Sequence, residues 1–346
     1  MPELAATEGV ATAPGAPAPP ARRAAARWVG RIAPLVIVAA VLGAGPTLYN
    51  NLAFLTTLAI YILLAQGVNI VYGFTGYLPF GFVGFFGAGI YGSSLAIVYW
   101  HVGGYTAIGL GALTSVVAAV VLSPLLRLSG AYFALATLAA SQALYFIVAN
   151  ESWTFGESGM SLPLIFSPTA LYVVAVVAVT VTLIVVFYVR DSHFGLSLRA
   201  IRSDAVSAAM AGVNVVRTRT IAWLVSAAIA GVAGALWALM TSAFYAETPF
   251  DLTISVYAIV FALFGGVRTV VGPVVGTVVL YSLYQYIGIS NPQYFELIYG
   301  LLIVVLVLFL PGGLTSLVGG RGDRPAWWNR LVRHRAAPET APEVAP

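Results

Sequence analysis

The chain has 346 residues, of which 60% are hydrophobic and only 8% are charged, and its mean hydropathy is +0.94. Uncharged apolar runs of about 20 residues recur along it, which is the length that crosses the ~30 Å hydrocarbon core of a bilayer. The alternating segments of a membrane β-barrel are absent, and the lack of cysteine excludes disulfides, thiolate chemistry and cysteine-based metal sites. The composition therefore predicts an all-α, polytopic membrane helix bundle.

The N-terminal residues 1–27 are rich in Ala and Pro and show no periodicity, which predicts a disordered cytoplasmic tail. The arginines at 22–31 and the apolar run that follows have the outline of a signal peptide. However, the run is long, and no convincing small-x-small cleavage site follows it. We therefore expect an uncleaved first span, with a signal peptide as the alternative.

The arginines predict the topology of the spans. All sixteen basic residues are Arg, clustered at 22–31, 190–219 and 321–335, with single residues at Arg127 and Arg268. Cytoplasmic loops collect such charges, so an even number of spans should separate successive clusters. This gives about ten transmembrane helices with both termini in the cytoplasm. The expected spans are about 32–49, 52–72, 77–101, 104–126, 130–150, 168–189, 220–244, 252–266, 270–289 and 294–311.

Small residues recur at four-residue spacing in several of these spans, a pattern that lets helix backbones approach closely in lipid. We interpret them as helix-packing surfaces, with a substrate path as the less favoured alternative. The clearest sets are Gly84, Ala88 and Gly92; Ala227, Gly231 and Ala235; and Gly272 and Gly276.

A compact polar segment at 190–219 interrupts the apolar chain between the sixth and seventh expected spans. Within it we expect a short helix, with Ser203 as N-cap, Asp204 at the first helical position and Gly212 as the C-terminal stop. One face is small, because Ala205, Ala208, Ala209 and Gly212 follow helical spacing. So short a helix is marginal in water. It is either a cytoplasmic element that docks in a groove of another protein or a solvated connecting loop.

The energy source is expected to lie outside this chain. The chain has no Gly-Lys-Ser/Thr phosphate-binding loop, so we do not expect it to be the ATPase. We find no catalytic constellation for a membrane face, so we do not expect another enzyme either. It also lacks the cluster of acidic or histidine residues in mid-membrane that a proton-coupled carrier would need.

Five segments together resemble bacterial ABC importer permeases of the branched-chain amino acid type, in particular the M-type subunit of the high-affinity importers. The segment "GLSLRAIRSDAVSAAMAGVNVVRTRT" at 195–220 resembles the loop that seats in a cleft of the ATPase subunit in that family. The others are "GYLPFGFVGFFGAGIYGSSL" at 76–95, "LRLSGAYFALATLA" at 126–139, "FGGVRTVVGPVVGTVV" at 264–279 and "LPGGL" at 310–314.

The chain departs from that family's usual pattern at three places. Pro79 stands where the family commonly has Ser, and Arg268 where it has Gly or another small residue. Ser203 and Asp204 stand where it has Glu-Asn, so one acidic residue is kept but shifted by one position.

The resemblance implies a transmembrane permease domain at 28–318, followed by an Arg-rich cytoplasmic tail at 319–346. It implies a permease subunit of an ATP-driven importer for branched-chain amino acids in the bacterial inner (cytoplasmic) membrane. A second homologous permease subunit, two ABC ATPase subunits that bind ATP-Mg, an extracytoplasmic solute-binding protein and membrane lipid are the implied partners. No nucleic acid, metal, cofactor or catalytic residue is expected on this chain. The alternatives are the same machine for urea, amides or sugars, and a secondary transporter.

Two sets of site residues follow. In the coupling contact we expect Ala205, Ala208 and Ala209 to pack in the ATPase cleft, while Arg199 and Arg202 pair with acids at its rim. For the translocation path the candidates are polar residues inside the spans, for which helix packing is the alternative, and two aromatic residues at the centre of the 126–139 motif. The coupling set is Leu198, Arg199, Ala200, Ile201, Arg202, Asp204, Ala205, Ala208, Ala209 and Gly212. The path set is Gln66, Asn69, Thr75, Tyr132, Phe133, Thr137, Ser141, Gln142 and Gln285.

Overall fold

The computed structural model describes residues 51–155 and 158–290, with 38, 40, 42–48 and isolated positions beyond 290. Among the described residues, seven helices are long and apolar enough to cross a membrane, and they correspond to the second to eighth expected spans. They are Leu52–Gly73, Phe80–Trp100, Gly104–Val121, Gly130–Asn150, Pro168–Asp191, Val215–Thr241 and Thr248–Gly265. The protein is therefore a multi-pass helix bundle. The two tails and most of the first and tenth expected spans lie outside the described residues, so the count of ten stays a prediction.

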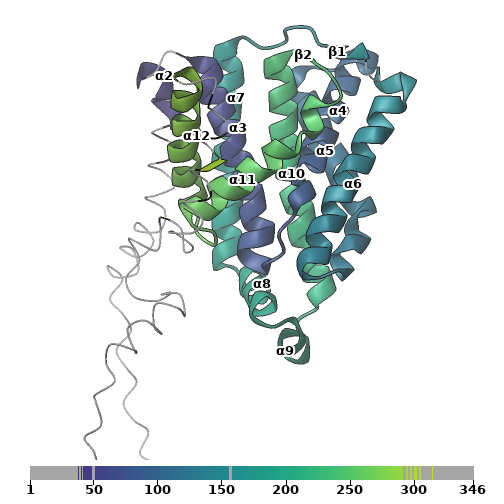
Figure 1. Ribbon diagram of the computed structural model, residues 1–346, viewed down its shortest axis with the longest axis vertical. Helices are drawn as coiled ribbons and strands as arrows, with labels where there is room; N and C mark the ends of the chain where they lie inside the picture. The colour runs from purple at the N-terminus through teal and green to yellow at the C-terminus, as the bar shows by residue number, and fades with distance from the viewer. Residues whose placement is uncertain are drawn as a thin grey trace, which may run out of the picture.

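The elements follow one another in the order shown in Figure 1. Before the polar loop they are α2 (Gly45–Leu48), α3 (Leu52–Val68), the π-helix η1 (Asn69–Gly73), η2 (Phe80–Phe82), α4 (Val83–Trp100), α5 (Gly104–Val121), η3 (Ser123–Arg127), α6 (Gly130–Asn150), η4 (Ser152–Thr154), β1 (Met160–Ser161) and α7 (Pro168–Asp191). From the polar loop onward they are α8 (His193–Ser203), α9 (Ala205–Met210), α10 (Val215–Thr241), β2 (Ala243–Phe244), η6 (Thr248–Phe250), α11 (Leu252–Gly265) and α12 (Gly272–Ser290).

Helix α10 forms the centre of the bundle and packs mainly against α4, α5 and α3 (Figure 1). Three glycines meet where α4, α5 and α10 cross. A Cβ atom on Gly231 would lie 2.6 Å from the carbonyl oxygen of Gly111, and one on Gly89 would lie 2.5 Å from the Cα of Gly231. The backbones are therefore in direct contact, which confirms the packing interpretation for the small face of this span.

Helices α11 and α12 form a hairpin held by a second glycine crossing. A Cβ atom on Gly276 would lie 2.2 Å from the carbonyl oxygen of Phe261, and one on Gly265 would lie 1.8 Å from the carbonyl oxygen of Gly272. The small residues predicted to pack in the ninth span therefore do so. The turn at 266–271 that joins the two helices contains Arg268 in a left-handed conformation, with φ of 73°.

Most of the described arginines lie at one end of the bundle. Helices α8 and α9 lie at one end, and β1 and β2, which pair antiparallel, lie at the other (Figure 1). Because successive helices cross the bundle in alternate directions, Arg127 joins the arginines of 190–219 at the α8–α9 end. Glu151, Glu247 and Asp251 lie at the opposite end. The positive-inside rule predicts that the α8–α9 end is cytoplasmic.

Candidate functional site

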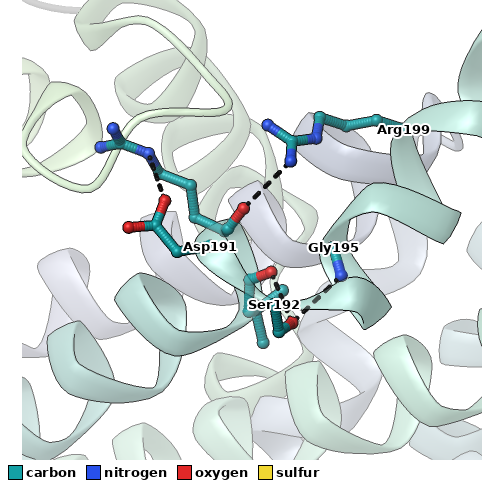
Figure 2. A network of polar contacts seen from close by, with 6 residues as sticks. Asp191, Ser192, Gly195 and Arg199 are labelled. Carbon is teal, nitrogen blue, oxygen red and sulfur yellow. Dashed lines mark hydrogen bonds and ion pairs between the residues drawn. The ribbon is translucent and has the colours of Figure 1, made fainter. Parts of the chain in front are cut away.

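A sharp corner turns the end of α7 into α8. Ser192 is the N-cap of α8, and its hydroxyl oxygen accepts a hydrogen bond of 3.2 Å from the backbone N–H of Gly195 (Figure 2). A Cβ atom on Gly195 would lie only 1.8 Å from the carbonyl oxygen of Val189. The corner therefore requires glycine, because the two helix ends touch through their backbones.

Arg199 closes the same corner from within α8. Its Nη2 donates a hydrogen bond of 3.2 Å to the carbonyl oxygen of Arg190, whose own side chain lies 3.5 Å from the carboxylate of Asp191 (Figure 2). We expected Arg199 to pair with an acid on another protein. Within this chain it caps the end of α7, because the last carbonyl groups of a helix lack donors within the helix. Its pairing with an external acid stays a prediction.

The short helix α9 begins one residue later than predicted. Asp204 is its N-cap, and the carboxylate accepts from the backbone N–H of Val206 at 3.3 Å and of Ser207 at 2.9 Å. The Ser207 hydroxyl also donates to this carboxylate, and these bonds lower the pKa of Asp204. The prediction of Ser203 as N-cap was wrong: Ser203 ends α8 and bonds back to Arg199. An Asp carboxylate can accept several such bonds, and hydrogen bonds to a charged acceptor are stronger than those to a neutral hydroxyl.

The C-terminal stop of α9 agrees with the prediction. Gly212 has a φ of 88°, and its N–H donates to the carbonyl oxygen of Ala209 at 3.0 Å, while that of Val213 donates to Ala208 at 3.0 Å. These two bonds form a Schellman motif, which requires a left-handed residue and therefore favours glycine.

Only part of the small face of α9 points into this chain: Ala208 is buried, whereas Ala209 and Gly212 are exposed. Ala208 is only 4% exposed, whereas Val206 and Met210 on the other side are 67% and 78% exposed. The expectation that Ala208 inserts into the cleft of another protein does not fit this arrangement, because its side chain is already buried within this chain, where α9 packs against α8 and α10. The exposed apolar face of α9 consists of Val206, Ala209 and Met210, and we call it the outer face.

The inner side of α8 anchors the loop to the bundle. Leu198 and Ile201 are 0% and 3% exposed, so their side chains are packed within the chain. Arg202 is half-buried, and its Nη1 donates to the carbonyl oxygens of Tyr72, at 3.1 Å, and Gly73. Within this chain Arg202 thus bonds to the last residues of the π-helix η1, while its pairing with an external acid stays a prediction. Ala200 and Ala205 complete the predicted coupling set: Ala200 is exposed and Ala205 is half-buried.

Two predicted path residues, Gln66 and Asn69, hold the turn at 266–271. The Gln66 amide donates to the carbonyl oxygen of Val270 at 2.6 Å, and the Asn69 amide donates to that of Thr269 at 2.9 Å. The Asn69 side-chain oxygen accepts from the backbone N–H of Arg268 at 2.7 Å. Both amides are fully buried. These bonds support the packing alternative for this pair.

The other predicted path residues do not converge on one site. Buried hydroxyl groups of Thr75, Thr137 and Ser141 bond to carbonyl groups of their own helix at 2.5–2.8 Å. The remaining four differ in exposure. Phe133 is fully buried, Tyr132 is 76% exposed, Gln142 is half-buried, and Gln285 is half-buried with its amide 3.5 Å from the Tyr281 hydroxyl.

A groove of about 410 Å³ lies between the segment 76–79 and the first turns of α6. Phe133 contacts one wall, because its ring packs edge-on against Tyr77 with 5.4 Å between centroids, and the guanidinium of Arg219 lies 3.6 Å above the Tyr77 ring. Sequence reasoning named Tyr132 and Phe133 but missed the lining. The available signal was that two quoted motifs, 76–95 and 126–139, form its two walls. The lining residues are Gly76, Tyr77, Leu78, Phe80, Gly130, Ala131, Ala134 and Leu135.

Comparison with known proteins identifies the family. Residues 50–307 match the family described as branched-chain amino acid transport system, permease component. The chain is 28% identical over 295 residues to the high-affinity branched-chain amino acid transport system permease protein LivM of Salmonella typhimurium and to that of Escherichia coli, covering 76% of this chain and 69% of each relative.

A more distant relative is the probable branched-chain amino acid transport permease protein LivH of Methanocaldococcus jannaschii. It is 27% identical over 203 residues, which cover 56% of this chain and 60% of that relative. No solved structure matches the chain. Because the family match spans most of the described bundle, this chain belongs to the permease component family of branched-chain amino acid transport systems, as a multi-pass membrane permease.

Proposed function

We propose that this chain is one of two homologous permease subunits of an ATP-driven importer for branched-chain amino acids. Two ABC ATPase subunits bind ATP-Mg and supply the energy, and an extracytoplasmic binding protein delivers the solute. The proposal is supported by the family match over residues 50–307. It is supported as well by the 28% sequence identity to two permeases whose names describe branched-chain amino acid transport. The chain itself hydrolyses no ATP and holds no cofactor.

The element that contacts the ATPase is the α8–α9 loop. Its position at one extreme of the bundle supports this assignment (Figure 1), and so does its division into two sides. The inner side is anchored by Leu198, Ile201 and Arg202, while the outer face of Val206, Ala209 and Met210 is free of contacts that bury it within this chain. An amphipathic helix that presents such a face can seat in a groove of a partner.

The solute passes between this chain and the second permease. The groove beside Tyr77 has a mostly apolar lining, including Leu78, Phe80 and Leu135, which suits an aliphatic side chain better than urea, amides or sugars. A secondary transporter is less well supported, because the buried amides Gln66 and Asn69 are already bonded to backbone groups.

Reconstitution tests the proposal. The chain is co-purified with its second permease, its ATPases and its binding protein, placed in liposomes, and supplied with radiolabelled leucine, urea or a sugar. We expect leucine accumulation that requires ATP on the ATPase side and stops with a hydrolysis-deficient ATPase. Leucine uptake by the permease chains without ATPases would contradict the ATP-driven assignment. ATP-dependent uptake of urea or a sugar, without uptake of leucine, would show that the transported solute is not a branched-chain amino acid.

Labelling tests the orientation in the bacterial cytoplasmic membrane. The chain has no cysteine, so A200C on the exposed side of α8 gives a single thiol. We expect a membrane-impermeant maleimide to label it in inverted vesicles and not in intact cells with a permeable outer membrane. A cysteine at the exposed Leu164, at the opposite end, is the matched control and should show the reverse pattern.

A further inference from the structure

We propose that Arg202 is the positioning residue through which movement of the α8–α9 loop reaches the turn at 266–271 inside the bundle. The proposal rests on the proposed function in one respect, namely that the ATPases move this loop. The path of contacts runs from α8 to the π-helix η1, and from η1 to the turn that joins α11 and α12.

The first step joins α8 to η1. Arg202 donates to two successive carbonyl oxygens, those of Tyr72 and Gly73, and its guanidinium lies 5.6 Å from the centre of the Tyr72 ring. Its aliphatic stem packs on Gly76, where a Cβ atom would lie 3.3 Å from the Arg202 Cγ. Both bonds come from the same guanidinium nitrogen, Nη1, and they tie α8 to the end of η1. A shift of α8 therefore acts directly on that end.

The second step joins η1 to the turn. A Cβ atom on Gly73 would lie 2.3 Å from the side-chain oxygen of Asn69 and 3.1 Å from the backbone nitrogen of Arg268. Gly73, which accepts the Arg202 bond, is therefore packed against both the amide and the turn. The segment is also a π-helix, Asn69–Gly73, and such local departures from α-helical geometry are frequent at functional sites.

The third step fixes the turn itself. Asn69 bonds to Arg268 and Thr269, and Gln66 bonds to Val270, so three successive residues of the turn are held by two amides of the same helix. Asn69 also donates to Gln66 at 3.2 Å, which ties the two amides together. Arg268 keeps a positive φ that is unfavourable for a side chain of this size, so the conformation of the turn depends on these bonds.

The same movement reaches the groove. The segment 76–79 follows η1 directly and forms one groove wall, beginning with Gly76, on which the Arg202 stem packs. Arg127 is the matched control, because it is an exposed arginine in η3, at the same end of the bundle but outside the α8–α9 loop.

The first experiment measures coupling in the complete transporter in liposomes. The readout is the number of solute molecules imported per ATP hydrolysed, compared among wild type, R202Q, R202K and R127Q. We expect R202Q to lower this ratio about two- to thirtyfold, as residues along a coupling network do, with R202K in between and R127Q within about twofold of wild type. A proportional loss of uptake and hydrolysis in R202Q, or an equal loss of the ratio in R127Q, would overturn the proposal.

The second experiment tests the linkage in the full-length chain alone, in nanodiscs, and so does not depend on the proposed function. Spin labels at A200C and V275C, both exposed positions, report the distance between α8 and the start of α12. We expect a narrow distribution in wild type and R127Q and a broad one in R202Q, with R202K partly restoring the width. An unchanged width in R202Q overturns the linkage even if transport is ATP-driven. If transport proves not to be ATP-driven while the width changes as expected, the proposed function fails and the linkage stands.

Discussion

The crossing of α4, α5 and α10 and the α8–α9 loop are held together in opposite ways. At the crossing, Gly89, Gly111 and Gly231 bring three backbones into contact, and the stabilisation comes from close packing without side chains. In the loop, capping bonds at Ser192 and Asp204 and the carbonyl bonds of the arginines define the structure, while the outer face remains exposed. The crossing therefore cannot accommodate larger side chains. The loop, in contrast, is anchored to the bundle on its inner side and exposes its outer face to a partner.

The largest effect should follow from filling the crossing. G231L places a side chain where even a Cβ atom would lie 2.5–2.7 Å from Ser115 and Gly111. We expect a loss of about 3 kcal/mol in the free energy of unfolding, measured by titrating SDS into mixed micelles. G109L is the matched control, because no atom lies within 4 Å of a Cβ atom at Gly109. Equal stability of the two variants would show that the crossing is loosely packed.

The next effect should come from the amide that holds the 266–271 turn. N69A leaves the backbone N–H of Arg268 and the carbonyl group of Thr269 without these bonds. We expect a loss of about 2 kcal/mol in unfolding free energy, by the same titration. N150A is the control, because the exposed Asn150 side chain bonds only to a carbonyl of its own helix at 2.8 Å. An unchanged unfolding free energy of N69A would mean that the turn does not depend on the hydrogen bonds of Asn69.

A smaller effect, confined to binding, is expected on the outer face of the loop. M210D places a charge on a side chain that is 78% exposed in this chain, so stability should not change. If the ATPase covers this face, its affinity should fall roughly tenfold, which corresponds to about 1.4 kcal/mol, measured by titrating the ATPase onto immobilised permease. L164D, at the opposite end, should bind like wild type. If M210D binds the ATPase like wild type, the outer face of α9 is not part of the contact with the ATPase.

The smallest effect is the pH dependence of α9. The Ser207 hydroxyl, followed by the backbone N–H groups of Ser207 and Val206, lowers the pKa of Asp204. The resulting stabilisation is present above the unfolded pKa of about 3.9 and is lost as the pH falls through the lower folded value. A spin label at A209C should therefore become more mobile below about pH 4. The same label in D204N should show no such change, and a transition of equal size there would assign it to another group.

The sequence alone determined the class of the protein and some of its helix ends. Long apolar runs and clustered arginines predicted a multi-pass helix bundle, because burial in lipid and charge placement act on each segment separately. Gly212 was predicted as the stop of α9 because a Schellman motif depends only on neighbouring residues. The five resembling motifs gave the family for the same reason, since they can be read along the chain without knowledge of its fold.

Only the tertiary structure decided which partners the polar side chains take. Arg202 lies 130 positions along the chain from Tyr72, and Asn69 lies 200 positions from Thr269, so no local pattern could pair them. The inward face of Ala208 and the groove beside Tyr77 were likewise set by how helices pack against one another. A buried polar group must find a partner wherever the fold provides one, and that is a property of the assembled bundle.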